Sequence, residues 1–177
     1  MTDTDFSILF AIRELFAGGT FDSLMLWAST AGDAGAVWFA IGAVLLWKPS
    51  TRRLGAAVIL AVAVYALIGN GILKPLIERL RPCELKDTVD MILACPETFS
   101  FPSGHTGASF AAAGVFWLLK SPWRWAALAG AALIAFSRLY LFVHFPSDIA
   151  GGIFCGLFAA YVAVRLTALP ALNRRLA

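Results

Sequence analysis

Charged residues are scarce in this sequence of 177 residues, of which only 14% are Asp, Glu, Lys or Arg. A soluble domain carries roughly 25%, and the 60% of hydrophobic residues found here would leave a water-soluble fold with too much exposed apolar surface. The formal net charge of +3 is too small to indicate nucleic acid as a partner. The composition therefore excludes a soluble domain, a disordered chain and a collagen-like fibre. It favours a single integral membrane domain over residues 1–177.

Long apolar runs take the place of the missing charges. A helix needs roughly 20 apolar residues to cross a bilayer. Four runs approach that length, namely Leu54–Leu73, Gly104–Leu119, Trp125–Val143 and Ile149–Val164. Upstream, Leu24–Trp47 is broken at Gly32–Gly35 and reads either as one imperfect span or as two short crossings. We predict an all-α, polytopic transmembrane helical bundle of about six helices.

The first helix of this bundle has two interpretations. The segment Phe6–Phe16 contains Arg13 and Glu14 between apolar residues, which is typical of an amphipathic helix lying at the membrane interface. The same residues also fit the first turns of the first span. The first helix is therefore either interfacial or interrupted.

Basic residues occur in short clusters that orient the predicted spans. The clusters are Lys48, Arg52 and Arg53; Lys120 and Arg124; and Arg165, Arg174 and Arg175. With four spans after Lys48, all three clusters fall on one side, which the positive-inside rule makes cytoplasmic. The long segment Lys74–Phe101 and the turn His144–Ser147 then face outward.

Cysteine is also rare, with three residues in the chain. Cys83 and Cys95 lie in the long outward segment, and Cys155 lies within the last span. In an oxidising compartment the first two could form a disulfide that closes a loop of about 13 residues, which stabilises by about 3 kcal/mol in the chain-entropy model. The alternative is two free thiols.

Polar residues that a membrane tolerates poorly gather at the predicted outward face, and each is a functional candidate. They are Lys74, Arg81, Ser103, Gly104, His105, Arg138, His144 and Asp148. Both histidines of the chain are among them. Four separate segments therefore deliver nucleophilic, acidic and cationic groups to one membrane boundary.

The cations of this group have structural and functional interpretations. Lys74 and Arg81 could be ordinary snorkelling side chains. If their helix continues, the seven-residue spacing puts both cations on one face, and Pro82 marks the helix end. Arg138 inside a span needs an acidic partner or an anion, and a guanidinium fits phosphate oxygens in a bidentate fork.

The remaining polar residues suit an anion and a nucleophile. Ser103 is a good N-cap for the helix that begins at Gly104, and a helix N-terminus binds phosphate, with His105 in its first turn. His144 and Asp148 are four residues apart, so the carboxylate can fix the tautomer of the imidazole and make its free nitrogen more nucleophilic. The pair could instead be half of a metal site, although no third His, Cys or Glu lies nearby in the sequence.

These residues, in this order, resemble the three-part signature of the type 2 phosphatidic acid phosphatase (PAP2) superfamily. The matching blocks are Lys74 with Arg81-Pro82, Pro102-Ser103-Gly104-His105, and Ser137-Arg138 with His144 and Asp148. The resemblance implies a metal-independent hydrolase of phosphoric monoesters or diphosphates that needs no cofactor and forms a phosphohistidine intermediate. It also implies a role for each matching residue. His144 is similar to the family's nucleophile, Asp148 to its orienting partner and His105 to the general acid; Lys74, Arg81, Ser103, Gly104 and Arg138 correspond to phosphate-binding positions.

The substrate expected from this resemblance is a phosphorylated lipid in the bilayer. We favour undecaprenyl diphosphate, with phosphatidic acid, phosphatidylglycerol phosphate and lipid A 1-phosphate as alternatives, at the outward face of a bacterial cytoplasmic membrane. An anion transporter is the alternative outside enzymes. Phe142 and Phe145 stand where many bacterial members have Gly and Tyr. Neither is expected to supply chemistry, but the Phe142 ring in place of Gly is expected to narrow the pocket entrance or make it more apolar. The oligomeric state is open.

Overall fold

The computed structural model describes residues 3–16, 18–86 and 89–169 and is helical throughout most of these ranges. The elements are α1 Asp3–Phe16, α2 Gly19–Ala31, the 3₁₀ turn η1 Asp33–Gly35, α3 Ala36–Leu46, α4 Pro49–Tyr65, the π-helical segment η2 Ala66–Leu73, α5 Lys74–Ile77, α6 Pro82–Leu85, α7 Gly104–Leu118, α8 Arg124–Tyr140 and α9 Pro146–Thr167. The predicted all-α bundle is confirmed. Arg174 and Arg175, which we included in a basic cluster, lie outside the described residues.

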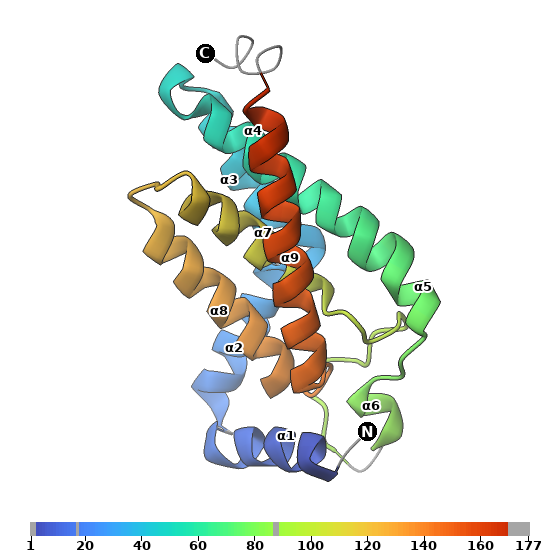
Figure 1. The fold of residues 1–177 in the computed structure, drawn as a ribbon. Helices are drawn as coiled ribbons and strands as arrows, with labels where there is room; N and C mark the ends of the chain where they lie inside the picture. Colours follow the sequence, from blue (N-terminus) through green and yellow to red (C-terminus); the bar gives the residue numbers. More distant parts are fainter. Residues whose placement is uncertain (1–2, 17, 87–88, 170–177) are drawn as a thin grey trace.

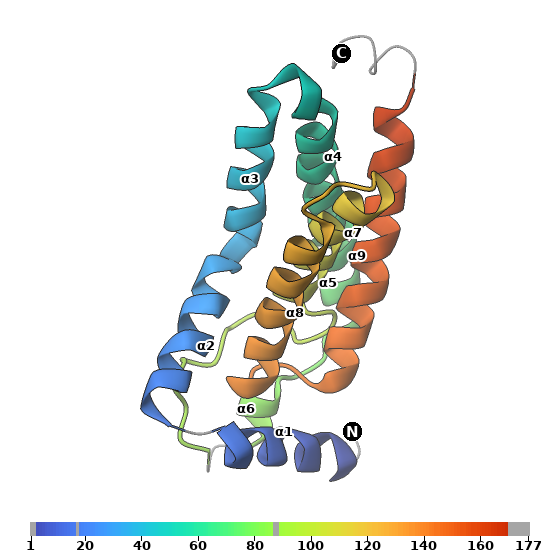
Figure 2. The same ribbon diagram turned by 90° about the vertical axis from the view of Figure 1, so that its left-hand side faces the viewer.

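The long helices run roughly along one axis, while α1 lies across one end of the bundle (Figures 1 and 2). The α3–α4 turn and the end of α9 lie at the opposite end from α1 and α6 (Figure 1). The structure therefore favours the interfacial interpretation of the first helix. Aromatic contacts hold it in place, because Phe6 packs edge-on against Phe145, with ring centroids 5.4 Å apart.

The apolar run that begins at Leu24 forms a bent pair of helices, α2 and α3. The two helices meet at an angle of 48° at η1 and together are long and apolar enough to span. The stretches Pro49–Leu85 and Pro146–Thr167 pass the same test of length and composition by themselves. At 15 and 17 residues, α7 and α8 are shorter than the roughly 20 residues of a typical span.

Small residues let α7 lie in the middle of the bundle, between α4, α8 and α9. The buried face of α7 is mostly Gly, Ala and Ser, including Ala111, Ala112 and Ala113. A Cβ atom on Gly156 of α9 would lie 2.5 Å from the carbonyl oxygen of Gly107, so a glycine is needed at that crossing. The Tyr65 hydroxyl then donates a 2.8 Å hydrogen bond to the Ser103 carbonyl and fixes α4 at the start of α7.

The helix that carries Lys74 does not continue to Arg81, so the two cations do not share a helix face and Pro82 does not end that helix. The helix ends at Ile77, because Glu78 adopts a left-handed conformation with φ of 50°, and Arg81 has extended backbone. Pro82 begins the short helix α6 instead of ending the previous one. The chain thereby turns back, and Arg81 approaches the segments around His105 and His144 from the side of the long loop.

The expectation that the Phe142 ring narrows the pocket entrance is wrong. Its ring and that of Phe145 are fully buried and pack against α1, with Phe142 5.3 Å from the Phe10 ring and Phe145 against Phe6. Phe142 has φ of 60°, a conformation that glycine adopts far more easily than a bulky residue. These rings attach the interfacial helix to the bundle and do not line the cavity described below.

Candidate active site

A cavity of about 730 Å³ lies where the segments before α5, before α7 and before α9 meet. Its walls include six of the eight residues singled out in the sequence: Lys74, Arg81, Gly104, His105, Arg138 and His144. Asp148 lies behind His144, fully buried, and Ser103 is buried beneath the start of α7. The fold therefore brings the three sequence blocks together around one polar cavity.

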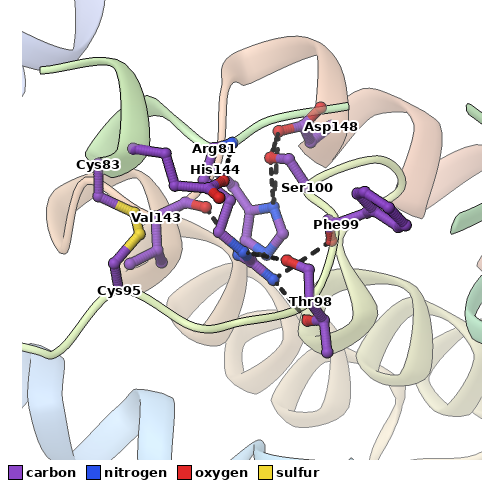
Figure 3. The surroundings of a disulfide bond; sticks show 10 residues. Arg81, Cys83, Cys95, Thr98, Phe99, Ser100, Val143, His144 and Asp148 are labelled. Carbon is purple, nitrogen blue, oxygen red and sulfur yellow. Dashed lines mark hydrogen bonds and ion pairs between the residues drawn. A yellow bond between two sulfur atoms is a disulfide. The ribbon is translucent and has the colours of Figure 1, made fainter. Parts of the chain in front are cut away.

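His144 lies in the turn between α8 and α9, where the start of α9 holds it from behind. The Asp148 carboxylate accepts a 2.8 Å hydrogen bond from the Phe145 backbone N–H and closes the N-terminus of α9. The same oxygen, Oδ2, lies 3.5 Å from Nδ1 of His144 and accepts a 2.5 Å hydrogen bond from the Ser100 hydroxyl (Figure 3). Nδ1 therefore faces the carboxylate.

The second ring nitrogen of His144 faces the Arg81 guanidinium. Nε2 lies 3.1 Å from the Nη1 atom of Arg81 (Figure 3). Since a guanidinium can only donate, Nε2 carries the lone pair and Nδ1 the proton. Burial is the main cause that lowers the pKa of His144 to about 3, the neighbouring Asp148 opposes this, and the charges of Arg81 and Arg138 lower the pKa further. The imidazole is thus neutral at physiological pH.

Arg81 is fixed by backbone carbonyls on both sides of the cavity. Its Nε donates to the Thr98 carbonyl at 2.6 Å, and Nη1 donates to the Val143 carbonyl at 2.8 Å (Figure 3). A disulfide between Cys83 and Cys95 joins the beginning and the end of the loop segment that follows Arg81. This covalent bond restrains the loop next to the Arg81 side chain.

Two further cations complete the cavity wall. The Lys74 ammonium donates a 2.5 Å hydrogen bond to the Phe99 carbonyl. Arg138 donates to the Ser29 hydroxyl, and its buried Nε has no hydrogen-bond partner within the described ranges. A buried donor without a partner is costly, and an anion in the cavity would satisfy it.

The start of α7 has the form expected from its sequence. The Ser103 hydroxyl caps the helix by accepting from the Thr106 backbone N–H at 3.4 Å. Gly104 and His105 follow at the cavity wall, where the unpaired N–H groups of a helix N-terminus favour an anion. Ser103 contributes through this cap, since its own side chain does not line the cavity.

Three participants were missed by the sequence argument. Arg79 donates to the Asp148 carboxylate at 2.6 Å, Ser100 donates to its other oxygen, and Asp33 lies 2.7 Å from Nε2 of His105. Arg79 is two residues before Arg81, and only Arg81 belongs to the sequence motif. Asp33 could have been singled out from the sequence, because an ionisable residue inside an apolar run is costly in a membrane and is therefore a functional candidate.

The donor set of the site is cationic. Across the residues that the structure describes, no group of three or more His, Cys, Asp or Glu side chains is placed to hold a metal ion. The groups on the cavity wall that can donate to an anion are two arginines, one lysine and two imidazoles, beside the carboxylates of Asp33 and Glu97. Such an arrangement fits a phosphate, whose oxygens accept charge-assisted hydrogen bonds.

The family model described as the PAP2 superfamily matches residues 50–169. This chain belongs to the PAP2 superfamily. The match includes every residue of the three motif blocks, so this PAP2 protein is a membrane lipid phosphatase, a phosphoric monoester hydrolase.

Individual relatives agree with this assignment. Over 154 residues this PAP2 chain is 30% identical to an undecaprenyl-diphosphatase of Sulfolobus acidocaldarius, covering 83% of this chain and 71% of the relative. The crystal structure of a transmembrane PAP2-type phosphatidylglycerolphosphate phosphatase from Bacillus subtilis superposes with a TM-score of 0.71 at 27% identity, over 93% of this chain and 87% of that one. The structure of Aquifex aeolicus LpxE shares the fold, with a TM-score of 0.77 at 21% identity over 93% and 96% of the two chains. The protein is thus an integral membrane protein with transmembrane helices.

Proposed function

We propose that this PAP2 phosphatase removes the terminal phosphate of undecaprenyl diphosphate through a phosphohistidine intermediate. The observation that carries the reaction is the neutral His144, whose Nε2 faces a cavity walled by Lys74, Arg81 and Arg138. The 30% identity to an undecaprenyl-diphosphatase supports the choice of substrate. A polyprenyl tail would stay in the bilayer while the diphosphate enters the cavity.

In the first step Nε2 of His144 attacks the terminal phosphorus. The N–P bond forms as the bond from phosphorus to the leaving oxygen breaks, and His105 gives its proton to that oxygen. Asp148 keeps the proton on Nδ1 of His144 and stabilises the positive ring that results. Water then attacks the phosphohistidine while His105 takes a proton from it, which releases phosphate and restores both imidazoles.

The cations stabilise the charge that builds up on the phosphoryl oxygens. Arg81 and Lys74 are held in place by backbone carbonyls before substrate arrives, so little reorganisation is needed during the reaction. The unpartnered Nε of Arg138 offers a further donor. The cap formed by Ser103 maintains the helix start that presents Gly104 to the anion.

A phosphatidylglycerol phosphate is the second candidate substrate. It is favoured by the 27% identity and the TM-score of 0.71 to the Bacillus subtilis phosphatase of that lipid. Phosphatidic acid and lipid A 1-phosphate would use the same chemistry. For all of these lipids, we propose that the cavity opens to the extracytoplasmic side of a bacterial inner membrane. The basic clusters at Lys48–Arg53 and Lys120–Arg124 lie toward the opposite side, and the positive-inside rule makes that side cytoplasmic.

Phosphate release by purified protein in detergent with EDTA tests the reaction. We expect His144→Ala to abolish turnover, vanadate to inhibit the wild type, and Cys155→Ala, a change in α9 away from the cavity, to leave turnover intact. Full activity of His144→Ala would refute the mechanism, and a requirement for added metal would revive metal catalysis. A side-by-side panel of the four lipid classes then ranks the substrates, and a failure of undecaprenyl diphosphate in that panel refutes the substrate proposal alone.

A further inference from the structure

A second Asp–His pair faces the same cavity. Oδ1 of Asp33, in the turn between α2 and α3, lies 2.7 Å from Nε2 of His105 at the start of α7. The two residues are 72 positions apart in the sequence, so only the packing of η1 against α7 brings them together. Asp33 lies outside the residues 50–169 that match the family.

The backbone of η1 is shaped for this contact. Ala34 and Gly35 both have positive φ, 51° and 71°, and turn the chain between α2 and α3 so that Asp33 lies over the start of α7. A Cβ atom on Gly32 would come within 3.0 Å of Cδ2 of His105 and 2.8 Å of the Ile134 side chain. The Nε2 edge of the imidazole therefore lies directly against the break between α2 and α3.

The contact fixes which nitrogen of His105 carries out proton transfer. A carboxylate only accepts hydrogen bonds, so Nε2 must carry a hydrogen, and Nδ1 is the nitrogen left for the substrate. Arg138 lines the same cavity and disfavours a positive imidazole, whereas a carboxylate at hydrogen-bond distance favours one. The side chain of Asp33 is 64% exposed, so its charge does not need compensation from the bundle.

We propose that Asp33 is a positioning residue that holds the general acid His105 by Nε2, so that Nδ1 exchanges protons with the substrate. This inference rests on the proposed phosphohistidine reaction. In its first half, His105 acts as the imidazolium with a hydrogen on each nitrogen, and the proton on Nδ1 passes to the leaving oxygen as the P–O bond breaks. In its second half, Nδ1 takes a proton from water as the oxygen of that water bonds to phosphorus and the bond from phosphorus to His144 breaks. Asp33 then acts on His105 as Asp148 acts on His144.

The dependence of turnover on the leaving group tests this role. An alkyl phosphate such as dodecyl phosphate needs a proton on its leaving oxygen, whereas 4-nitrophenyl phosphate does not. We expect kcat of Asp33→Ala to fall about ten- to a hundredfold on the alkyl phosphate, part of the 10²–10⁴ that general acid catalysis contributes, with a much smaller loss on the aryl phosphate. Asp33→Glu should recover part of the loss. Glu97→Gln, which removes another carboxylate from the cavity wall, should change KM without this selectivity. Equal losses on both phosphates, or no loss on either, would overturn the proposal.

Imidazole ¹⁵N NMR provides a readout that needs no turnover. The chain has two histidines, so the spectrum of histidine-labelled protein is simple, and His144→Gln assigns the signals. We expect His105 to carry its hydrogen on Nε2 in the wild type and to lose that preference in Asp33→Ala. Unchanged His105 signals would refute the pair. If the wild type releases no phosphate from any substrate, the proposed function is refuted, but the spectrum still tests the contact between Asp33 and His105. If the Asp33 variants have normal activity and unchanged spectra, the role of Asp33 is refuted and the proposed function is not affected.

Discussion

Removal of the charge of Arg79 should weaken both the bundle and the reaction. The Arg79 guanidinium donates to Asp148 at 2.6 Å and to the Ser147 hydroxyl at 2.7 Å, and it lies 4.4 Å from the centre of the Phe145 ring. The Asp148 side chain is fully buried, whereas that of Arg79 is 17% exposed. The variant Arg79→Met keeps the apolar stem over the ring and leaves one oxygen of a buried carboxylate without its cationic partner.

The magnitude follows from what remains around Asp148. A hydrogen bond to a charged group contributes about 1.5–3 kcal/mol. Because Ser100 and the Phe145 backbone still bond to the other oxygen, we expect a loss near the lower part of that range, about 2 kcal/mol. At about 2–4 °C per kcal/mol for a chain of this size, the melting temperature should fall by about 4–8 °C.

Thermal melts and phosphate release on the same preparations measure this prediction. If the loosened Asp148 also loosens His144, kcat/KM should fall by up to about thirtyfold, since about 1.4 kcal/mol corresponds to a factor of ten. Arg79→Lys should recover part of both losses. Lys86→Met is the matched control, because it removes a cation that only lies over the Phe6 ring at the same end of the bundle. An Arg79→Met protein that melts and turns over like the wild type would refute the reasoning.

Three further predictions follow from the same geometry. Because the pKa of His144 is about 3 in the fold and near 6.5 in an unfolded chain, the unfolded chain binds an extra proton between these values, so stability should fall as pH drops from about 6.5 toward 3. The loss should reach on the order of 3 kcal/mol at pH 4.5, and denaturant melts of His144→Gln should show a shallower slope. The Cys83–Cys95 bond closes a loop with a sequence separation of 12, so Cys83→Ser should cost about 3 kcal/mol in denaturant melts; an unchanged midpoint would contradict this. Gly32→Ala should displace the His105 ring and lower kcat on alkyl phosphates more than on aryl phosphates, and equal effects would count against the contact.

Much of the fold followed from local properties of the chain. Apolar runs marked the cores of α4, α7, α8 and α9 to within a few residues at most ends, because a membrane-spanning helix satisfies its own backbone hydrogen bonds and needs only an apolar surface. The helix start at Ser103-Gly104 was predicted from the sequence because a serine is a favourable N-cap. Each of these features depends on neighbours along the chain.

The sequence-based expectations failed for residues whose positions depend on partners distant in the sequence. Arg81 was expected on a helix, but the left-handed Glu78 ends that helix and Thr98, Phe99 and Val143 hold the side chain. Phe142 was expected at the pocket, yet it packs against α1. Sequence spacing contains no information about either contact.

The membrane environment, the helical class and the set of groups available for chemistry could all be predicted from the amino-acid sequence. Scarcity of charge and the order of His144, His105 and the three cations are properties of composition and spacing. How those groups are held depends on the packing of the helices. The partners Arg79, Ser100 and Asp33 reach Asp148 and His105 across 48 to 72 positions of chain. The physical reason is that tautomer and orientation are set by contacts a few ångströms long, and packing between helices, which no local pattern records, chooses those contacts.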